Sequence, residues 1–192
     1  VRICVQAATT SEAHIKDYFI ENRMGYTAVY AESPEEALQI YADGGCDALT
    51  SDQSQLYGLR TRLPDPSRHR ILPEVISKEP LGPAVRDDDP AWSDLVRWSL
   101  YTMINAEELK VTSANVDRVR EQAGKPEVRG LLDLDGSSGK ALGIAPQWGY
   151  RIVKQVGNYG ESFERNLGKQ SPLKIKRGLN ALWNYGGLLY AP

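Results

Sequence analysis

The sequence predicts an α/β fold, with a parallel sheet and crossover helices in residues 1–80 and a mainly helical region after them. Three observations support this prediction. Short β-rich apolar runs alternate with stretches of helical periodicity as far as about residue 80, which is the pattern of strand–helix–strand units. In residues 109–192, capping residues precede apolar periodic stretches, and Gly or Pro follows them. The 192 residues, 41% of them hydrophobic, are enough to bury a substantial core.

The elements of the first region can be placed in order. They are a strand and polar loop at 3–10, a helix carrying Ile15, Tyr18 and Phe19, a strand at 26–30, a helix at 33–43, a strand at 45–52, a helix at 55–62 and a strand at 71–76. The helix at 33–43 has the clearest signals, because Ser33 can cap it and Pro34 suits its first position. Gly44 and Gly45 then end it.

The first and third strands end in groups of opposite chemistry. Thr9 and Thr10 stand at a helix start, where unpaired backbone N–H groups and the helix dipole can hold an anion. Asp52 ends the third strand and suits a cation. Ligands of such sheets collect at the carboxyl ends of parallel strands. The three residues therefore predict a site for a zwitterion, although helix capping is the alternative for each residue taken singly.

The two cysteines occupy matching places in the same strands. Cys4 precedes Thr9 by five residues and Cys46 precedes Asp52 by six. If the strands are parallel neighbours, both cysteines lie at one end, and the strand spacing of about 4.8 Å suits a disulfide. We predict a Cys4–Cys46 disulfide, which favours an exported protein. The alternative is a pair of buried thiols in a reducing compartment.

Composition favours a small-molecule partner. The chain has 23 basic and 25 acidic residues and a pI near 5.8, so its overall charge offers no reason to expect nucleic acid or an anionic membrane surface. No apolar run has the length of a membrane span, and no signal peptide is recognisable at the amino terminus. The chain begins almost inside a strand, which suggests a mature fragment or a piece of a longer protein. No cofactor is expected.

The region after residue 80 poses a packing problem. A helix is predicted at 90–105, behind the capping aspartates 87–89, with an apolar face made of Trp92, Leu95, Val96, Leu100, Met103 and Ile104. This face needs a cover, which could be the first eighty residues, a second copy, a separate lobe or its own domain; we favour self-association.

Further helices are expected in the last third of the chain. Ser113 should cap a helix at 116–122, and Ser171 and Pro172 should open another that buries Leu173, Ile175, Leu179 and Leu182. The basic face formed by Lys174, Lys176 and Arg177 is expected to be solvated.

Several stretches resemble the periplasmic substrate-binding proteins of amino-acid ABC transporters, in particular the general L-amino-acid branch. Residues 5–12 (VQAATTSE) are similar to a signature of that family, with Ala8 where glycine is usual, and residues 47–54 (DALTSDQS) resemble its aspartate-rich strand end. Residues 76–86 (ISKEPLGPAVR) are similar to its crossover segment. Residues 156–161 (VGNYGE) and 177–184 (RGLNALWN) look like the carboxy-terminal extension of the branch.

The resemblance implies a type II periplasmic-binding fold with two lobes. Residues 1–80 would be the second, ligand-binding lobe, 81–108 a crossover strand (83–85) and helix returning to the first lobe, and 109–192 the helical extension. Thr9 and Thr10 would hold the carboxylate of an L-amino acid and Asp52 its ammonium group, and Cys4 and Cys46 match cysteines of the branch. A membrane permease would be the partner, and the location periplasmic. Most of the first lobe is missing, so this chain is expected to bind free amino acids weakly or not at all.

Other motifs and functions are less well supported. Residues 136–141 echo a phosphate loop with the wrong spacing, Asp133 and Asp135 begin a calcium loop that is not completed, and His14 and His69 lack metal-ligand spacing and are expected at the surface. No set resembles a nucleophile, a base and an orienting group, so no enzyme is expected. The alternatives are a dehydratase-like enzyme of the same fold, which would need an acid–base pair in the cleft, and a ligand-sensing effector domain.

Overall fold

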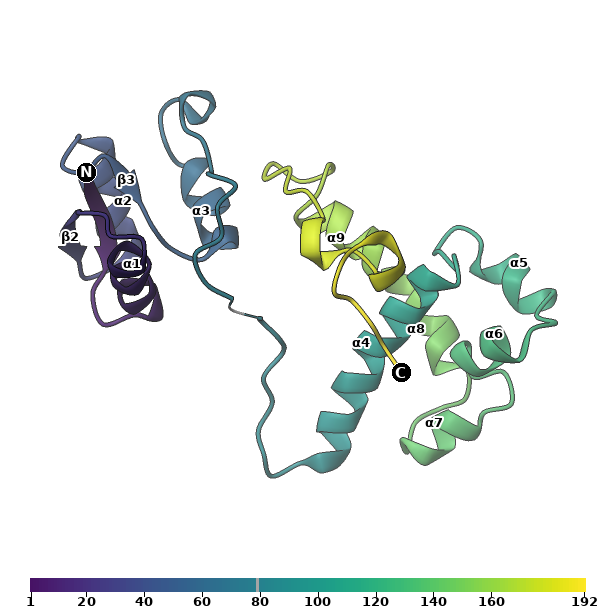
Figure 1. Cartoon of the computed structure of the whole chain (residues 1–192). Helices are drawn as coiled ribbons and strands as arrows, with labels where there is room; N and C mark the ends of the chain where they lie inside the picture. The colour runs from purple at the N-terminus through teal and green to yellow at the C-terminus, as the bar shows by residue number, and fades with distance from the viewer. Residues whose placement is uncertain (79) are drawn as a thin grey trace. The chain divides into compact units, whose positions relative to one another are not determined.

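The computed structural model describes residues 1–78 and 80–192. The chain divides into two compact units, unit 1 (Val1–Leu81) and unit 2 (Gly82–Pro192), which are drawn in Figure 1 and described separately below. In the described part of the chain, none of the helices combines the length and apolarity needed to span a bilayer.

Unit 1 is built on a parallel sheet of three strands in the order β2-β1-β3. The strands are β1 (Arg2–Gln6), β2 (Thr27–Ala31) and β3 (Ala48–Leu49), and the helices are α1 (Thr10–Glu21), α2 (Pro34–Ala42), α3 (Gln53–Arg60) and the short 3-10 helix η1 (Pro66–Arg68). Cys4 in β1 is in register with Val29 and Leu49 on its two neighbours. The prediction that the first and third strands are parallel neighbours is confirmed.

The core of unit 1 lies around β1. Ile3, Cys4 and Val5 are buried in succession, as expected of a central parallel strand that is covered on both faces. Helix α2 contacts all three strands and α1 contacts β1, with α2 beginning as predicted at Pro34 after the Ser33 cap. A second cluster joins Leu38, Leu59 and Leu63 and holds α3 against α2.

One strand predicted from the sequence is wrong. Residues 71–76 do not pair with another strand in the part of the chain that the structure describes. The strand expected at 83–85 would pair in the missing first lobe, so it stays a prediction. Leu72 and Val75 are exposed, and Pro73 has no N–H group to donate to a neighbouring strand. An apolar run can form a strand only where a sheet edge is available to it.

Unit 2 is helical. Its elements are α4 (Pro90–Glu108), α5 (Val116–Glu121), α6 (Pro126–Leu131), α7 (Ser137–Ala141), α8 (Trp148–Val156) and α9 (Tyr159–Asn166), followed by the 3-10 helices η2 (Gly178–Asn180) and η3 (Trp183–Tyr185). Asp89 caps α4, because its carboxylate accepts from the Trp92 N–H at 2.9 Å. Helix α4 packs on α8 and α9. Its Ile104 is buried in a cluster with Leu182 and Ala191, while Trp92 and Trp98 remain exposed. Self-association through the exposed part stays a prediction.

Two details of the predicted helices in unit 2 are wrong. Helix α5 begins after Asn115 instead of being capped by Ser113, whose hydroxyl and N–H both bind the Glu161 carboxylate. No α-helix follows Pro172. The chain there is tied to other segments, since the Ile175 N–H donates to Leu167 O at 2.8 Å and Leu182 pairs with Leu189. Leu182 is buried as expected, but Leu179 is exposed.

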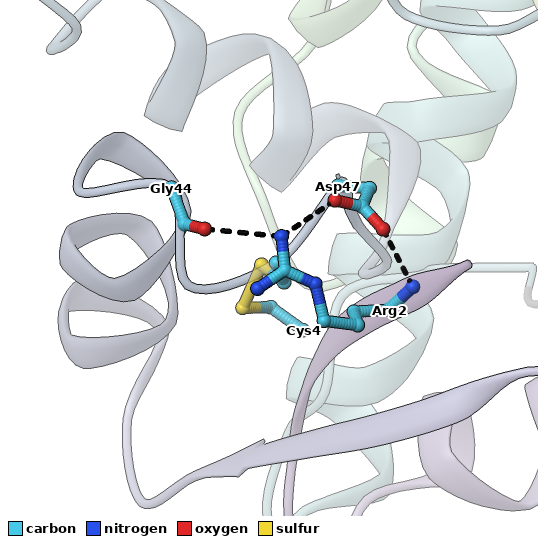
Figure 2. The surroundings of a disulfide bond; sticks show 5 residues. Arg2, Cys4, Gly44 and Asp47 are labelled. Atoms are coloured by element: carbon cyan, nitrogen blue, oxygen red, sulfur yellow. Dashed lines mark hydrogen bonds and ion pairs between the residues drawn. A yellow bond between two sulfur atoms is a disulfide. The ribbon is translucent and has the colours of Figure 1, made fainter.

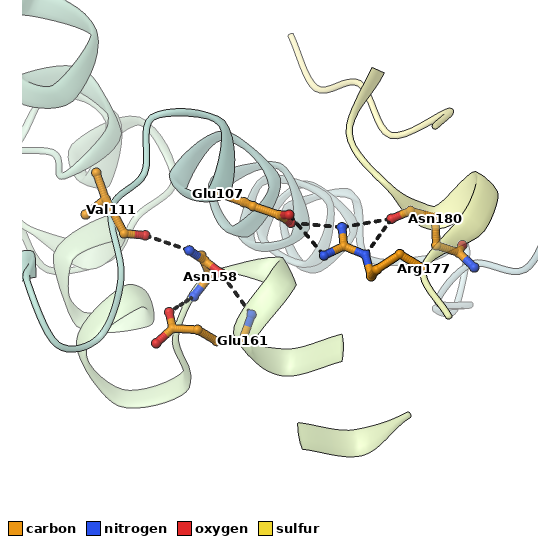
Figure 3. Close-up of polar contacts among 6 residues, drawn as sticks. All are labelled: Glu107, Val111, Asn158, Glu161, Arg177 and Asn180. Atoms are coloured by element: carbon orange, nitrogen blue, oxygen red, sulfur yellow. Dashed lines mark hydrogen bonds and ion pairs between the residues drawn. The ribbon is translucent and has the colours of Figure 1, made fainter. Parts of the chain in front are cut away.

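A half-buried ion pair joins the end of α4 to the carboxy-terminal segment (Figure 3). The Arg177 guanidinium donates to both carboxylate oxygens of Glu107 at 3.0 and 3.1 Å and also to Asn180 O. Its cation lies over the rings of Tyr159 and Phe163. Arg177 is therefore engaged in packing, and the expectation that it is simply solvated is wrong.

A second group of polar contacts, which like the first we call a joint, fixes the start of α9. Asn158 and Glu161 form a reciprocal capping box, and the Asn158 side-chain amide donates to Val111 O at 2.9 Å (Figure 3). Gly160 makes room for the Glu107–Arg177 ion pair, since a Cβ there would lie 3.0 Å from the Glu107 carboxylate and 3.1 Å from the Arg177 guanidinium. Most residues of the 156–161 motif thus hold the extension together.

The Arg177→Met variant is expected to lower the free energy of unfolding of unit 2 by about 2 kcal/mol, because it leaves a half-buried carboxylate without its charged donor. The two side chains are only 19% and 18% exposed. Urea unfolding followed by tryptophan fluorescence measures this directly, since all four tryptophans lie in unit 2. The control is Arg97→Met, which breaks an exposed pair with Asp94 and should cost about 0.5 kcal/mol or less. Equal losses in the two variants would contradict the expectation.

Candidate functional site

The predicted site residues lie at one edge of the sheet of unit 1. Helix α1 follows β1 after a short loop, and α3 follows β3 in the same way. Because Cys4 is in register with Leu49, Gln6 is level with Ser51, and the two strands deliver their loops to the same edge. The structure thus brings the loops of Thr9, Thr10 and Asp52 to the carboxyl ends of adjacent strands, where ligands of such sheets bind.

Thr9 caps α1. Its hydroxyl donates to Gln6 O at 2.7 Å and accepts from the Glu12 N–H at 3.4 Å. For this residue the capping alternative holds, so its hydroxyl is already engaged with the backbone. Its main contribution to a site is to fix the direction in which the first N–H groups of the helix point.

Thr10 is in a different position. It is the first residue of α1, it is exposed, and its hydroxyl has no hydrogen-bond partner among the described residues. The N–H groups of Thr10 and Ser11 belong to the first turn, which lacks intrahelical acceptors. This hydroxyl and these two amides are the donors that remain for an anion.

Glu12 lies at the candidate site, and sequence reasoning did not assign it a role there. Its carboxylate accepts from the Ala8 N–H at 2.8 Å, just before the helix start. An acidic side chain therefore already occupies part of the positive end of α1. The spacing from Thr9 to Glu12, which is that of a capping box, was the signal that could have identified it.

Ala8 adopts a left-handed backbone conformation, with φ +58°. Glycine takes this conformation without a steric penalty, whereas a Cβ costs about 1 kcal/mol. The turn that leads β1 into α1 therefore has a conformation suited to glycine although alanine occupies it.

Asp52 stands at the N-cap of α3 but does not cap it. Its carboxylate makes no capping hydrogen bond and its side chain is exposed. The neighbouring Ser51 hydroxyl donates to the Gln55 side chain instead. The capping alternative is thus not realised for Asp52, and its charge remains available to a cation.

The predicted disulfide is present (Figure 2). Cys4 and Cys46 are buried and bonded, with their Cα atoms 5.7 Å apart. Beside them the Arg2 guanidinium donates to Asp47 at 2.7 Å and to Gly44 O at 3.2 Å. The Arg2 hydrogen bond lowers the pKa of the Asp47 carboxyl, and Asp47 raises the pKa of Arg2. Both contacts join β1 to the segment that leads into β3.

The residues of the incomplete motifs have structural roles. The buried carboxylate of Asp133 accepts from the N–H and hydroxyl of Ser138 and from the Gln147 N–H, and Asp135 accepts from Ser137. His69 is half-buried rather than at the surface, with its Nδ1 atom 2.8 Å from the Tyr41 hydroxyl. His14 is half-buried as well. Within residues 1–78 and 80–192 there is no group of three or more His, Cys, Asp or Glu suited to a metal ion.

Known proteins resemble the chain over nearly its whole length. No protein-family model matches it. It is 51% identical over 190 residues to YhdW, an amino-acid ABC transporter-binding protein of Escherichia coli, and 51% identical over 192 residues to AapJ, the general L-amino acid-binding periplasmic protein of Rhizobium johnstonii. The chain is homologous to the binding proteins of amino-acid ABC transporters. Each match covers 99% of this chain and 56% of the relative, so the chain spans little more than half the length of these family members.

A solved structure supports the same relationship. A periplasmic binding protein of Brucella ovis, described as an ABC transporter protein with glutathione bound, superposes with a TM-score of 0.91 at 51% identity. The match covers all of this chain and 60% of that one. The predicted fold class, an α/β lobe of a periplasmic binding protein with a helical extension, is confirmed.

Ala8→Gly is expected to stabilise unit 1 by up to about 1 kcal/mol, because glycine removes the cost of the left-handed conformation. Ala13→Gly, at an exposed position inside α1, should instead destabilise the unit by about 1 kcal/mol. Amide hydrogen exchange of β1 would measure both changes. The same sign for the two substitutions would contradict the assigned conformation of Ala8.

Loss of the disulfide is expected to lower the free energy of unfolding of unit 1 by about 4 kcal/mol, because the bridge closes a long loop in the unfolded chain. The two cysteines are 42 residues apart in sequence. Hydrogen exchange of β1 in the oxidised protein and in the Cys4→Ala, Cys46→Ala double variant measures the difference. Dithiothreitol should speed the exchange of β1 in the native sequence by the same amount and should leave the exchange of the double variant unchanged. Equal exchange in all of these samples would refute the expectation.

Proposed function

We propose that this chain supplies one face of the ligand site in a solute-binding protein of an amino-acid ABC importer. The observation that carries the proposal is the homology over 99% of the chain, together with the free Asp52 carboxylate and the α1 start at one sheet edge. On this proposal Thr10, with the helix start that Thr9 caps, receives the α-carboxylate of the ligand. Asp52 receives the α-ammonium group.

Each charge of the ligand has a physical partner on this face. The carboxylate gains charge-assisted hydrogen bonds from the Thr10 hydroxyl and the first-turn amides, at the positive end of the helix dipole. The ammonium group gains an ion pair with Asp52. A reversed head group would place the ligand carboxylate beside the Asp52 carboxylate, and the repulsion between these like charges favours the orientation with the ammonium group toward Asp52.

The proposal extends to compartment and partner. AapJ is described as periplasmic, and the buried Cys4–Cys46 disulfide suits an oxidising compartment. A membrane permease would receive the ligand from the complete binding protein. The relatives are described as binding proteins, which supports a role in binding here.

A second ligand class is favoured by the chemistry of the Brucella ovis complex, which contains glutathione. The γ-glutamyl residue of glutathione keeps both a free α-carboxylate and a free α-ammonium group. It therefore presents the same zwitterion as a free amino acid. A γ-linked peptide is compatible with Thr10 and Asp52, whereas an ordinary α-linked peptide separates the two charges.

The affinity of this 192-residue chain is expected to be low. Thr10 and Asp52 are exposed, and an ion pair in water contributes only about 0–1 kcal/mol. Millimolar or weaker binding of free L-amino acids follows. Micromolar affinity for any common L-amino acid would contradict this expectation.

NMR titration tests the assignment of the two charges. L-Glutamate should shift the amide signals of Thr10, Ser11 and Asp52, whereas N-acetyl-L-glutamate, which lacks the ammonium group, should lose the effect at Asp52. Asp52→Asn should abolish the difference between these two ligands. Asp43→Asn is the matched control, because Asp43 is an exposed carboxylate that follows α2 and precedes β3, away from the strand ends.

The same titration separates the ligand classes. Glutathione should shift the same signals as glutamate, and its isomer with an α-peptide bond from glutamate should not. Equal effects of Asp43→Asn and Asp52→Asn, or shifts confined to residues outside this sheet edge, would refute the proposed site.

A further inference from the structure

Five large apolar side chains of unit 2 are exposed within twelve consecutive residues. They form what we name the aromatic platform: Leu179, Trp183, Tyr185, Leu188 and Tyr190. Each is between 52% and 73% exposed. Such a concentration of exposed apolar residues indicates an interaction surface.

The backbone beneath the platform is ordered. Leu182 and Ala191 are buried against Ile104 of α4, which anchors the segment in the core. The Leu188 N–H donates to Leu179 O at 2.8 Å. Gly187 lies so close to Ala181 that a Cβ would be 1.8 Å from its carbonyl oxygen. The exposure of the platform is therefore built into a packed loop and is not the result of a frayed segment.

The segment that carries the platform has charged residues of one sign. The sequence contains no Asp or Glu after Glu164, and it contains five Lys and Arg in that stretch, in a chain whose formal net charge is −2. Arg165 donates to Val156 O and Arg177 is paired with Glu107. The other three, Lys169, Lys174 and Lys176, are exposed and form no ion pair within the part of the chain that the structure describes.

Two acidic side chains of α4 contact this segment, and only one of them is paired with a cation. Glu107 binds Arg177, and Glu108 accepts from the Trp183 indole N–H at 3.3 Å. Glu108 keeps its negative charge, and the three unpaired lysines outweigh it. They precede the platform in the same segment, with Lys176 three residues before Leu179. This combination of free cations and exposed Trp, Tyr and Leu is complementary to a surface that is negative outside and apolar a few ångströms below.

We propose that the aromatic platform docks on an anionic phospholipid bilayer. Trp and Tyr favour the headgroup region because each ring has an apolar body and a polar edge. The lysines add electrostatic attraction to anionic lipids. A bilayer fits better than a protein pocket, because the five side chains come from one loop and their charged neighbours are flexible lysines rather than bidentate arginines. The inference does not depend on the proposed amino-acid site.

Flotation of the 192-residue protein with vesicles tests the proposal. Vesicles of phosphatidylcholine containing about one third phosphatidylglycerol should bind the protein, and pure phosphatidylcholine vesicles should bind it at least about tenfold more weakly. About 1 M NaCl, which shortens the screening length to about 3 Å, should release it. Trp183 fluorescence should be quenched by brominated acyl chains, and Trp183→Phe should remove most of that quenching.

Matched variants locate the contact. Tyr185→Ser with Leu188→Ser should reduce the partition coefficient about tenfold by removing apolar area from the platform. Leu72→Ser with Val75→Ser removes comparably exposed apolar side chains from unit 1 and should leave binding unchanged. Lys174→Gln with Lys176→Gln should weaken binding to the anionic vesicles alone. Circular dichroism and tryptophan-detected unfolding check that the platform variants are folded.

Three outcomes would overturn the proposal. They are the absence of binding to anionic vesicles at low salt, equal binding to neutral and anionic vesicles, and equal losses in the platform and unit 1 variants. If the protein does not bind anionic vesicles at low salt, a protein partner would be the remaining candidate to cover the aromatic platform.

Discussion

The parallel pairing of β1 with β3, fastened by the Cys4–Cys46 disulfide, is the constraint on which the candidate site depends. β3 contributes only two residues to the sheet, too few to hold a register by ladder hydrogen bonds alone. The disulfide and the Arg2–Asp47 contacts lie just before it and set which residue faces which. A shift of one residue would turn the side chains of β3 to the other face and would move the loop that carries Asp52 along the edge of the sheet.

Unit 2 depends on polar joints as much as on its apolar core. Glu161 binds both Asn158 and Ser113, and Arg177 binds both Glu107 and Asn180. These joints connect segments that are 48 and 70 residues apart in sequence. The motifs at 156–161 and 177–184, which resemble the carboxy-terminal extension of the branch, therefore maintain the packing of this region.

The sequence was most informative where the signals were local. Ser33, Pro34 and Asp89 start helices as predicted, and the matched spacing of Cys4 and Cys46 correctly indicated neighbouring strands. Prediction from the sequence failed where contacts with distant segments determine the local conformation. Residues 71–76 have the composition of a strand but find no sheet edge, and Pro172 begins no helix because Ile175 and Leu182 are tied to other segments. For the site, the positions of Thr9 and Asp52 could be foreseen, but which of them caps a helix depends on side-chain geometry that spacing does not determine.

Glu12 has a consequence for how a ligand would arrive. Because its carboxylate binds the Ala8 N–H and the Thr9 hydroxyl is fixed on Gln6 O, the turn before α1 is held in shape by internal acceptors. Its conformation is pre-organised, so an incoming carboxylate would not need to order this loop and the entropic cost of binding is reduced. The Glu12 carboxylate also offsets part of the positive charge at the start of α1, so this end of the helix is stabilised when no ligand is bound.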